Sequence, residues 1–431
     1  MTTNTFEKTV LPSGMTVVSE SLPDRHSVSI GVWVRSGARD EPLDRLGITH
    51  FIEHMLFKGT ERRDARAIAA SLESLGGHLD AFTGRESVCY YARALEEHLP
   101  EVIDVLADIV CRSRFDPRDV EREKSVVREE IFSCEDNPED KVNELQAEQL
   151  WPGHELGRPI LGTVETVDRF EQGVLAGYHG SRHAPDRLVI AGAGALSQGR
   201  LVEEIERRFT PPMGAPLPLS NGPPSFETSA RHVVRDDLQQ LYLALGTRGV
   251  AYGHADRYPL VVLSTLLGGG MSSRLFQSVR EEAGLAYSVY SAVEFHRDAG
   301  LLTIQLGVAP DRGREALARV RQELESLIEH GPTPEEVEAA RQQLRGSVLM
   351  GQESVSTRMY HLAHEEIYCG RFTPPEEQVE RVMAVTGEQV AALARERLDP
   401  AAFVLTALGP APGGPLGRED WTPASRTASR T

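Results

Sequence analysis

Three residues with the chemistry of a metal site lie within five positions of one another: His50, Glu53 and His54, in the sequence HFIEH. On a helix, residues four positions apart lie on one face about a turn apart, so both imidazoles can bind one metal ion. A carboxylate beside the second histidine can take a proton from a metal-activated water. The pattern predicts hydrolytic zinc chemistry, although five residues of this kind also arise by chance.

A catalytic zinc site needs a third protein ligand, and the segment EREKSVVREEI offers two carboxylates. Glu123 and Glu130 are seven residues apart and so lie on one face of a predicted helix, which we expect to be buried beside Val126 and Val127. Taken alone, such a segment is more typical of a solvent-exposed acidic helix. Together with the histidine pair, it predicts a helix that faces the metal.

The surrounding elements are a mixture of strands and helices. A turn at Pro12-Ser13-Gly14 between β-branched runs, and the alternating run SVSIGVWV, predict the first strands of a sheet. The segment GGHLDAFTGRESVCYYARA predicts a further pair of strands. Helical periodicity predicts helices over residues 47–57, 65–75, 96–111 and 116–134.

The chain divides near its middle. Residues 210–228 are rich in Pro, Gly and Ser and predict a linker between an N-terminal domain, residues 1–209, and a C-terminal domain, residues 229–409. One constant shift in numbering aligns Pro117 with Pro334 and also lays HFIEHM on LGGGMS. The match suggests a duplicated domain that has lost its polar metal-binding groups, but chance similarity between amphipathic helices would produce the same match.

Composition limits the classes of partner. The net charge is −18 and no basic stripe offsets it, which argues against nucleic acid and anionic membranes as partners.

The four cysteines form no C-x-x-C pair and predict a reducing compartment. No signal-like N-terminus and no run of 18 apolar residues occurs, so we expect a cytoplasmic protein. Residues 410–431 have no periodic apolar face and predict a flexible tail.

Three segments resemble the pitrilysin family of zinc peptidases, in particular its processing-peptidase branch. HFIEHMLFKGT with the later VEREKSVVREEI resembles the inverted-zincin signature. GGHLDAFTGRESVCYYA resembles the family's substrate-binding edge strand, and SSRLFQSVREEAGLAYSVYS resembles the signature of its second half. The resemblance covers nearly the whole chain. It implies an α+β fold with two homologous domains, each a mostly antiparallel sheet packed with helices, the second being a degenerate copy.

The resemblance also implies roles for residues of the first half. It assigns one zinc ion per chain to His50, His54 and Glu130, and the role of general base to Glu53. Glu123 would orient one of the metal ligands.

The substrate contacts implied by the resemblance lie in two places. Asp80, Ala81 and Phe82 belong to the edge strand, and Arg280 and Tyr287 belong to the second half. The family usually has asparagine where this chain has Asp80, and an ionised carboxylate cannot donate a hydrogen bond to a substrate carbonyl. The strand backbone could still pair with an extended peptide.

The implied function is a zinc-dependent endopeptidase that hydrolyses peptides or small unfolded proteins inside a cavity. A non-catalytic scaffold or partner subunit of the same fold is one alternative, and a metal-dependent hydrolase of non-peptide esters is another. The full set of ligands and base favours an active enzyme, and the edge strand favours peptides. Family members with two domains commonly pair, so we expect a homodimer, with a heterodimer with a sister subunit as the alternative.

Overall fold

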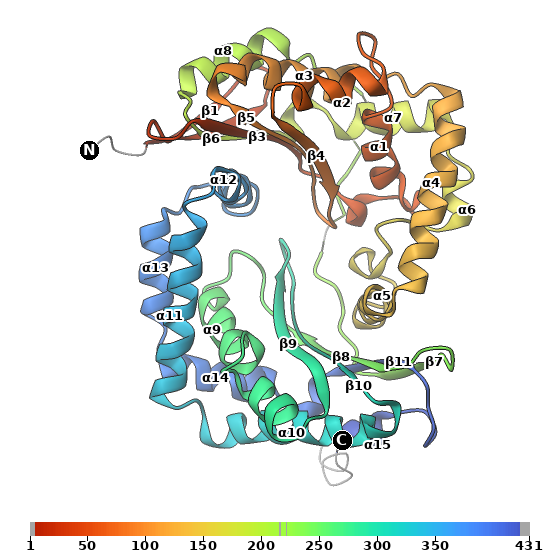
Figure 1. Cartoon of the computed structure of the whole chain (residues 1–431), viewed down its shortest axis with the longest axis vertical. Coiled ribbons are helices and arrows are strands. Elements are labelled where there is room, and N and C mark those ends of the chain that lie inside the picture. Colours follow the sequence, from red (N-terminus) through yellow and green to blue (C-terminus); the bar gives the residue numbers. More distant parts are fainter. Residues whose placement is uncertain (1–4, 215–216, 221, 423–431) are drawn as a thin grey trace. The chain divides into compact units, whose positions relative to one another are not determined.

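The computed structural model describes residues 5–214, 217–220 and 222–422, which form two compact units (Figure 1). Neither unit is continuous in the sequence. Unit 1 combines Met1–Ser133 and Arg158–Asn221 with Met350–Thr373, and unit 2 contains the remaining segments. Each unit therefore includes a helical segment from the other half of the chain, which a division at residues 210–228 does not describe.

Unit 1 is built on a six-stranded sheet in the order β1-β2-β6-β3-β5-β4. All neighbouring strands are antiparallel except β2 and β6, which are parallel. Strand β4 pairs only with β5 and forms one edge of the sheet. The strands are β1 (Thr5–Val10), β2 (Thr16–Ser21), β3 (Ser27–Val34), β4 (His78–Thr83), β5 (Val88–Leu95) and β6 (Leu188–Gly194).

Helices cover both faces of this sheet. Val28, Ile30 and Val32 of β3 point into the main core of the unit, and Trp33 points to the opposite face, where it packs with Met359 and Leu362 of α12. Figure 1 shows α12 on one side of the sheet and α3 on the other. The helices are α1 (Ile48–Leu56), α2 (Ala65–Glu73), α3 (Leu99–Arg112), α4 (Pro117–Asp136), α6 (Val164–Val167), α7 (Gln172–Arg182), α8 (Gln198–Arg208) and α12 (Val355–Cys369).

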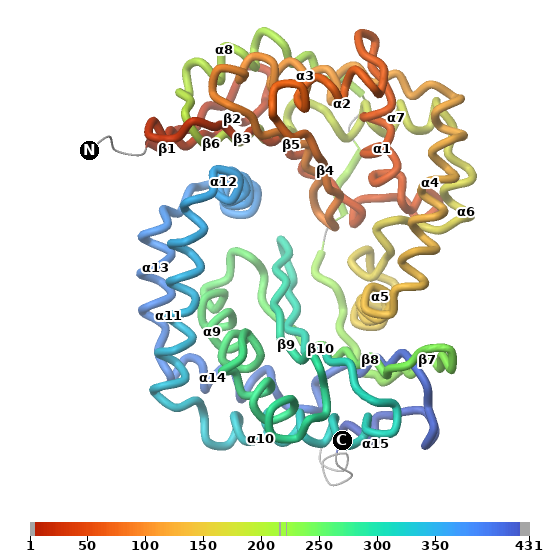
Figure 2. The backbone as a smooth tube through the Cα atoms, in the orientation of Figure 1, coloured from red at the N-terminus to blue at the C-terminus, as the bar shows by residue number. Residues whose placement is uncertain are grey.

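Unit 2 contains a five-stranded sheet in the order β7-β11-β8-β10-β9, with β7 and β11 parallel. Helix α5, from the first half of the sequence, packs against this sheet through Val142 and Leu145 (Figure 2). The strands are β7 (Ala230–Val234), β8 (Leu241–Arg248), β9 (Ala286–Phe295), β10 (Gly300–Val308) and β11 (Val404–Gly409). The helices are α5 (Pro138–Leu150), α9 (Arg257–Gly268), a π-helix over Phe276–Glu282, α10 (Gly313–His330), α11 (Pro334–Gly351), α13 (Pro375–Met383), α14 (Gly387–Arg397) and α15 (Arg418–Trp421).

The two units share one topology. If β2, β6, β3, β5 and β4 are matched with β7, β11, β8, β10 and β9, the strand order and the single parallel pair coincide. The shift that aligns Pro117 with Pro334 places the first residue of α4 on that of α11, and it also places the first residue of α5 on that of α12. The prediction of two similar α+β domains is therefore confirmed.

The same shift is wrong around the histidine motif. It lays HFIEHM on residues 267–272, but α9 ends at Gly268. By its place between β8 and β9, α9 is the counterpart of α1, and its first residue, Arg257, corresponds to Ile48 at a smaller shift. A shorter connection between strand and helix in unit 2 accounts for part of this difference, because it spans residues 249–256 there but residues 35–47 in unit 1.

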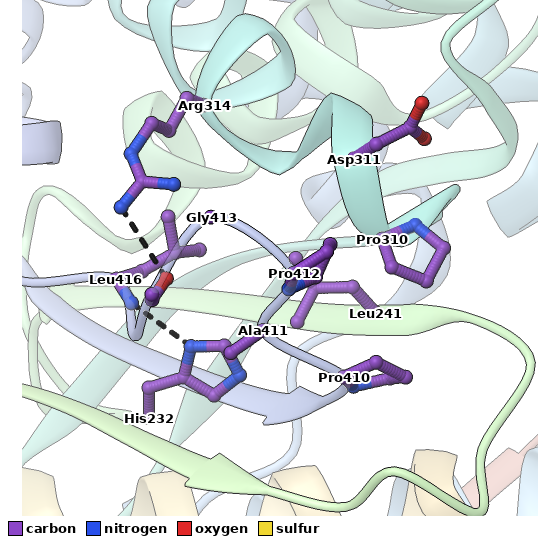
Figure 3. Close-up of a pocket in the computed structure, with 11 residues that line it drawn as sticks. His232, Leu241, Pro310, Asp311, Arg314, Pro410, Ala411, Pro412, Gly413 and Leu416 are labelled. Carbon is purple, nitrogen blue, oxygen red and sulfur yellow. Dashed lines mark hydrogen bonds between the residues drawn. The ribbon is translucent and has the colours of Figure 1, made fainter.

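The C-terminal segment corrects the prediction of a flexible tail from Pro410. Leu416 and Trp421 are buried in the core of unit 2, and the Trp421 indole donates a hydrogen bond to the Pro400 carbonyl at 2.7 Å. Figure 3 shows a pocket beside this segment, where Arg314 donates to the Gly414 carbonyl. Residues 423–431 lie outside the described part of the chain.

The predicted linker contains no helix or strand in the part that the structure describes, and residues 215, 216 and 221 lie outside that part. Arg182 and Arg187 donate hydrogen bonds to the Leu217 carbonyl and so attach the linker to unit 1. No helix in the described ranges is long and apolar enough to span a membrane.

Candidate metal centre

Helix α1 is the element that carries the histidine motif. Its apolar face, with Ile48, Phe51 and Met55, is buried in the core of unit 1, which leaves His50 and His54 on another face. The helix begins after Gly47, whose φ of +82° lies in the left-handed region, where glycine is favoured. A Cβ at this position would also lie 2.3 Å from the Leu161 carbonyl oxygen. The start of the helix therefore depends on this glycine.

The structure brings His50, His54 and Glu130 together in unit 1. The two imidazole rings lie 4.5 Å apart between centroids, and the Nε2 atom of each ring lies 3.6 Å from Glu130 Oε2. The three ligand atoms all lie within 4.8 Å of one another, and this is the single such cluster that the described residues form. Two imidazole nitrogens and one carboxylate oxygen are one of the donor sets found in catalytic zinc sites.

The polar atoms of this cluster fit a bound cation. Glu130 Oε2 is buried and has no hydrogen-bond partner among the residues that the structure describes. A buried carboxylate oxygen without a donor is costly, and a metal ion between it and the two Nε2 atoms removes that cost. Burial, together with the nearby His54, lowers the pKa of His50 to about 3, which keeps this imidazole neutral, as a metal ligand must be.

Glu123 lies next to the cluster and contacts one of its histidines, His54. Its buried carboxylate is 2.8 Å from His54 Nδ1 and 2.7 Å from Lys58 Nζ. Burial opposes ionisation, but the hydrogen bonds from His54 and Lys58 outweigh it and lower the pKa of Glu123. An ionised Glu123 accepts the Nδ1 proton of His54, so that Nε2, once it has no proton, could bind a metal ion beside Glu130.

The structure contradicts one prediction about helix α4, that both Val126 and Val127 are buried. Val127 is buried as expected, but Val126 is 49% exposed. On a helix, two consecutive residues point about 100° apart, so both valines cannot face the same core.

Glu53 lies on α1 beside the ligands, and its carboxyl group is hydrogen-bonded to a residue of the edge strand. The Thr83 hydroxyl at the end of β4 donates a hydrogen bond to Glu53 Oε2 at 2.6 Å. Burial raises the pKa of Glu53, although the Thr83 hydrogen bond and the charge of His54 oppose this rise. Sequence reasoning missed Thr83. The alternation of β4 places it on the same face as Leu79 and Ala81, which pack toward the core, and this signal could have identified it.

The predicted substrate residues of the edge strand lie in β4. Asp80 Oδ1 accepts a hydrogen bond from the Ala81 backbone N–H at 2.8 Å, and Tyr91 donates to Asp80 Oδ2 at 3.3 Å. The Phe82 ring is 37% exposed and lies 5.9 Å from the ring of Tyr360. The Asp80 side chain is therefore occupied by contacts within its own sheet.

Arg280 and Tyr287 lie together in unit 2. The Arg280 guanidinium lies 4.6 Å from the centroid of the Phe276 ring and 5.1 Å from that of Tyr287. Tyr287 is 82% exposed. Stacking on two rings restricts the arginine side chain before any ligand arrives.

Comparisons with known proteins agree with this geometry. Residues 16–164 match the family model described as "Insulinase (Peptidase family M16)", and residues 169–344 match "Peptidase M16 inactive domain". The chain is 39% identical over 384 residues to the uncharacterized zinc protease YmxG of Bacillus subtilis, covering 89% of this chain and 93% of that one. It is 37% identical to an uncharacterized zinc protease of Streptomyces coelicolor, covering 91% and 87% of the two chains.

Solved structures share the fold. A peptidase M16 inactive domain from Pseudomonas fluorescens has a TM-score of 0.88 at 21% identity, covering 94% of this chain and 98% of that one. A protease from Helicobacter pylori has a TM-score of 0.88 at 20% identity, covering 94% and 100%. These similarities do not single out the processing-peptidase branch. The two family models and the curated relatives establish that the chain belongs to peptidase family M16, the pitrilysin family of zinc metallopeptidases.

Proposed function

We propose that this protein is an active zinc endopeptidase that hydrolyses peptides or small unfolded proteins. The observation that carries the proposal is the convergence of His50 Nε2, His54 Nε2 and Glu130 Oε2 on one point, with Glu53 beside it on the same helix. A scaffold protein would have no need for a buried, unpartnered carboxylate oxygen at this point.

The roles of the first-unit residues follow from their contacts. His50, His54 and Glu130 would hold one zinc ion per chain, and a bound zinc ion supplies Lewis acidity that polarises the scissile carbonyl and acidifies water. Glu53 then takes the proton of the attacking water at Oε1 and passes it to the nitrogen of the leaving amine. Thr83 keeps Oε2 in place during both transfers, and Glu123 keeps the His54 ring oriented.

Peptides are the substrate class that the first unit favours. The outer edge of β4 has backbone groups for pairing with an extended chain, and the strand ends at Thr83, in contact with Glu53. Ala81 and Phe82 would contact such a chain, whereas the Asp80 side chain is engaged by Ala81 and Tyr91. A non-peptide ester has no use for a strand edge, so this observation favours peptides.

Unit 2 would contribute to substrate binding rather than to metal binding. Its counterpart of α1, helix α9, has the sequence RYPLVVLSTLLG and carries no histidine or carboxylate. Arg280 and Tyr287 are the residues that we propose bind peptide there.

We further propose that the protein forms a homodimer, with a heterodimer that includes a sister subunit as the second option.

The test is cleavage of an internally quenched peptide library by the purified protein, with and without a zinc chelator, and with Glu53→Gln as the matched inactive variant. We expect cleavage that chelator abolishes, that added zinc restores and that the variant lacks. A protein that holds zinc but cleaves no peptide, alone or mixed with its Glu53→Gln variant, would instead be a scaffold or partner subunit.

A further inference from the structure

We propose that Glu41 is a positioning residue of the metal centre, whose carboxyl group fixes the first turn of α1 and with it the ligand His50 and the base Glu53. Glu41 lies outside the histidine motif, in the connection between β3 and α1. The inference rests on the proposed function for its catalytic consequence. Its effect on metal geometry is independent of turnover.

The contacts of Glu41 are made to the backbone of the helix start. Oε2 accepts a hydrogen bond from the Gly47 N–H at 2.7 Å, and Oε1 accepts one from the Thr49 N–H at 2.8 Å. Burial raises the pKa of Glu41 to about 8, although hydrogen bonds from the Thr49 side chain and from the Thr49 and Gly47 backbone, and the charge of Arg158, oppose the rise. Glycine at the N-cap has no side chain to offer, so the N–H groups of the first turn need an acceptor from elsewhere. Thr49 is buried, and an unpaired N–H there would cost about 1–3 kcal/mol.

The position of this carboxyl group is itself fixed by the hairpin that carries the edge strand. The Ala38 N–H donates to the Gly84 carbonyl at 3.1 Å, and the Arg39 N–H donates to the Arg85 carbonyl at 2.7 Å. Arg39 and Glu86 also form a buried ion pair at 2.7 Å. One buried connection therefore joins the β4–β5 turn to the start of α1, and Glu41 is its contact with the helix.

Unit 2 provides an internal comparison. Its helix α9 occupies the same place in the topology as α1, but it begins after Asp256, whose side chain caps no backbone N–H. The connection that leads to α9 is shorter than the one that contains Glu41. The fold thus forms without this carboxyl group in the copy whose described residues form no candidate metal cluster. We conclude that Glu41 serves the geometry of the metal-bearing helix rather than the fold.

The test compares Glu41→Gln with Asp40→Asn in the full-length protein. Glutamine keeps the size of the side chain but turns an N–H₂ group toward one of the two backbone N–H donors. Asp40 is the matched control because it is buried in the same connection and also accepts two backbone N–H groups, from Gly37 at 3.2 Å and Ser220 at 2.9 Å. Neither of these donors belongs to α1.

Three measurements separate positioning from stability: the visible absorption spectrum of the Co²⁺-substituted protein, the rate of zinc release to a chelator, and kcat and KM on a quenched peptide. For Glu41→Gln we expect an altered Co²⁺ spectrum, zinc release faster by about tenfold and kcat lower by about tenfold, with KM within about twofold of wild type. For Asp40→Asn we expect wild-type values in all three.

Two results would overturn the inference. One is a Glu41→Gln protein that unfolds at a lower temperature yet keeps the wild-type Co²⁺ spectrum and kcat below that temperature. The other is an equal change in both variants. If Glu41→Gln does not fold, Glu41→Asp takes its place, because it keeps the carboxyl group but displaces both acceptors by one methylene, and the same signature is expected at smaller size. If wild type cleaves no peptide but the Co²⁺ and zinc-release differences appear, the proposed function fails and the positioning role stands.

Discussion

At the scale of single residues, two carboxyl groups of the site have pKa values that their surroundings shift in opposite directions. Glu123 is buried but paired with His54 and Lys58, which lowers its pKa. Glu53 is held by one neutral hydroxyl, and burial raises its pKa. A charged Glu123 suits the orientation of a ligand, and a carboxyl of raised pKa suits proton transfer near neutrality.

The first prediction concerns Glu53→Gln. The amide fills the same space but cannot accept a proton, so we expect kcat to fall by about 10³-fold while zinc content stays at the wild-type level. Steady-state kinetics and metal analysis on the same preparation check this. His54→Ala serves as the contrasting variant, because it should lose zinc as well as activity. Full turnover by Glu53→Gln would remove this residue from the role of base.

A second prediction tests Thr83, which donates the hydrogen bond to Glu53 Oε2. Thr83→Val keeps the shape of the side chain and removes the hydroxyl, so we expect kcat to fall by about tenfold with zinc content unchanged. Thr83→Ser restores the donor and should restore most of the rate. If valine and serine gave equal rates, the hydroxyl would have no part in catalysis.

At the scale of elements, the sequence was sufficient where a local pattern decides the structure. The alternation of SVSIGVWV predicted β3, and the structure has a strand over Ser27–Val34 with Val28, Ile30, Val32 and Val34 in one core. The helical spacing of the histidines likewise predicted α1. Period and turn residues are properties of neighbouring positions, so they are visible in the sequence alone.

Contacts between distant segments were not visible in the same way. The apolar residues of α12 predict an amphipathic helix, but nothing in their spacing says that it covers β3 and β6 of unit 1, which come much earlier in the chain. Glu41 was missed for this reason, because its hydrogen-bond partners belong to another element. For the candidate metal site, the need for a third ligand pointed to the two carboxylates Glu123 and Glu130, and the family resemblance then assigned Glu130 as the ligand.

A third prediction belongs to α15. The composition of residues 410–431 predicts a flexible tail, but Trp421 is 1% exposed and packs edge-on against Phe403. Trp421→Ala should therefore lower the free energy of unfolding by about 3–5 kcal/mol. Urea denaturation checks this value. A change below about 0.5 kcal/mol, the usual effect of a surface substitution, would show that the segment does not pack.

At the scale of the whole molecule, stability should depend on pH through buried histidines away from the metal centre. Burial lowers the pKa of His179 to about 4, and burial together with the nearby His179 holds the pKa of His183 well below its usual value. Both are therefore neutral in the folded protein. In the unfolded chain a histidine takes up a proton near pH 6.5, so stability is lost as pH falls below that value.

The fourth prediction isolates His179, whose Nε2 donates to the Val110 carbonyl at 2.9 Å. Between pH 6 and pH 4.5, wild type should lose up to about 1.4 kcal/mol more per pH unit than His179→Gln. Between pH 8 and pH 7.5 the two slopes should agree, because the histidine is then neutral in both states. Urea denaturation of the metal-free proteins across this range measures the difference. Equal slopes in the acid range would mean that His179 is protonated in the folded protein.

The last prediction tests whether unit 2 takes part in catalysis. Arg280 is held between the rings of Phe276 and Tyr287, so its guanidinium is pre-organised at little further entropic cost. If it binds peptide, Arg280→Ala and Tyr287→Phe should each lower kcat/KM by about tenfold or more, which corresponds to about 1.4 kcal/mol, with wild-type zinc content. Arg248→Ala is the matched control, because Arg248 also stacks on an aromatic ring, that of Phe226, and should leave kcat/KM unchanged. Wild-type kinetics in all three variants would confine substrate binding to unit 1. A loss confined to the Arg280 and Tyr287 variants would show that unit 2 takes part in binding the peptide.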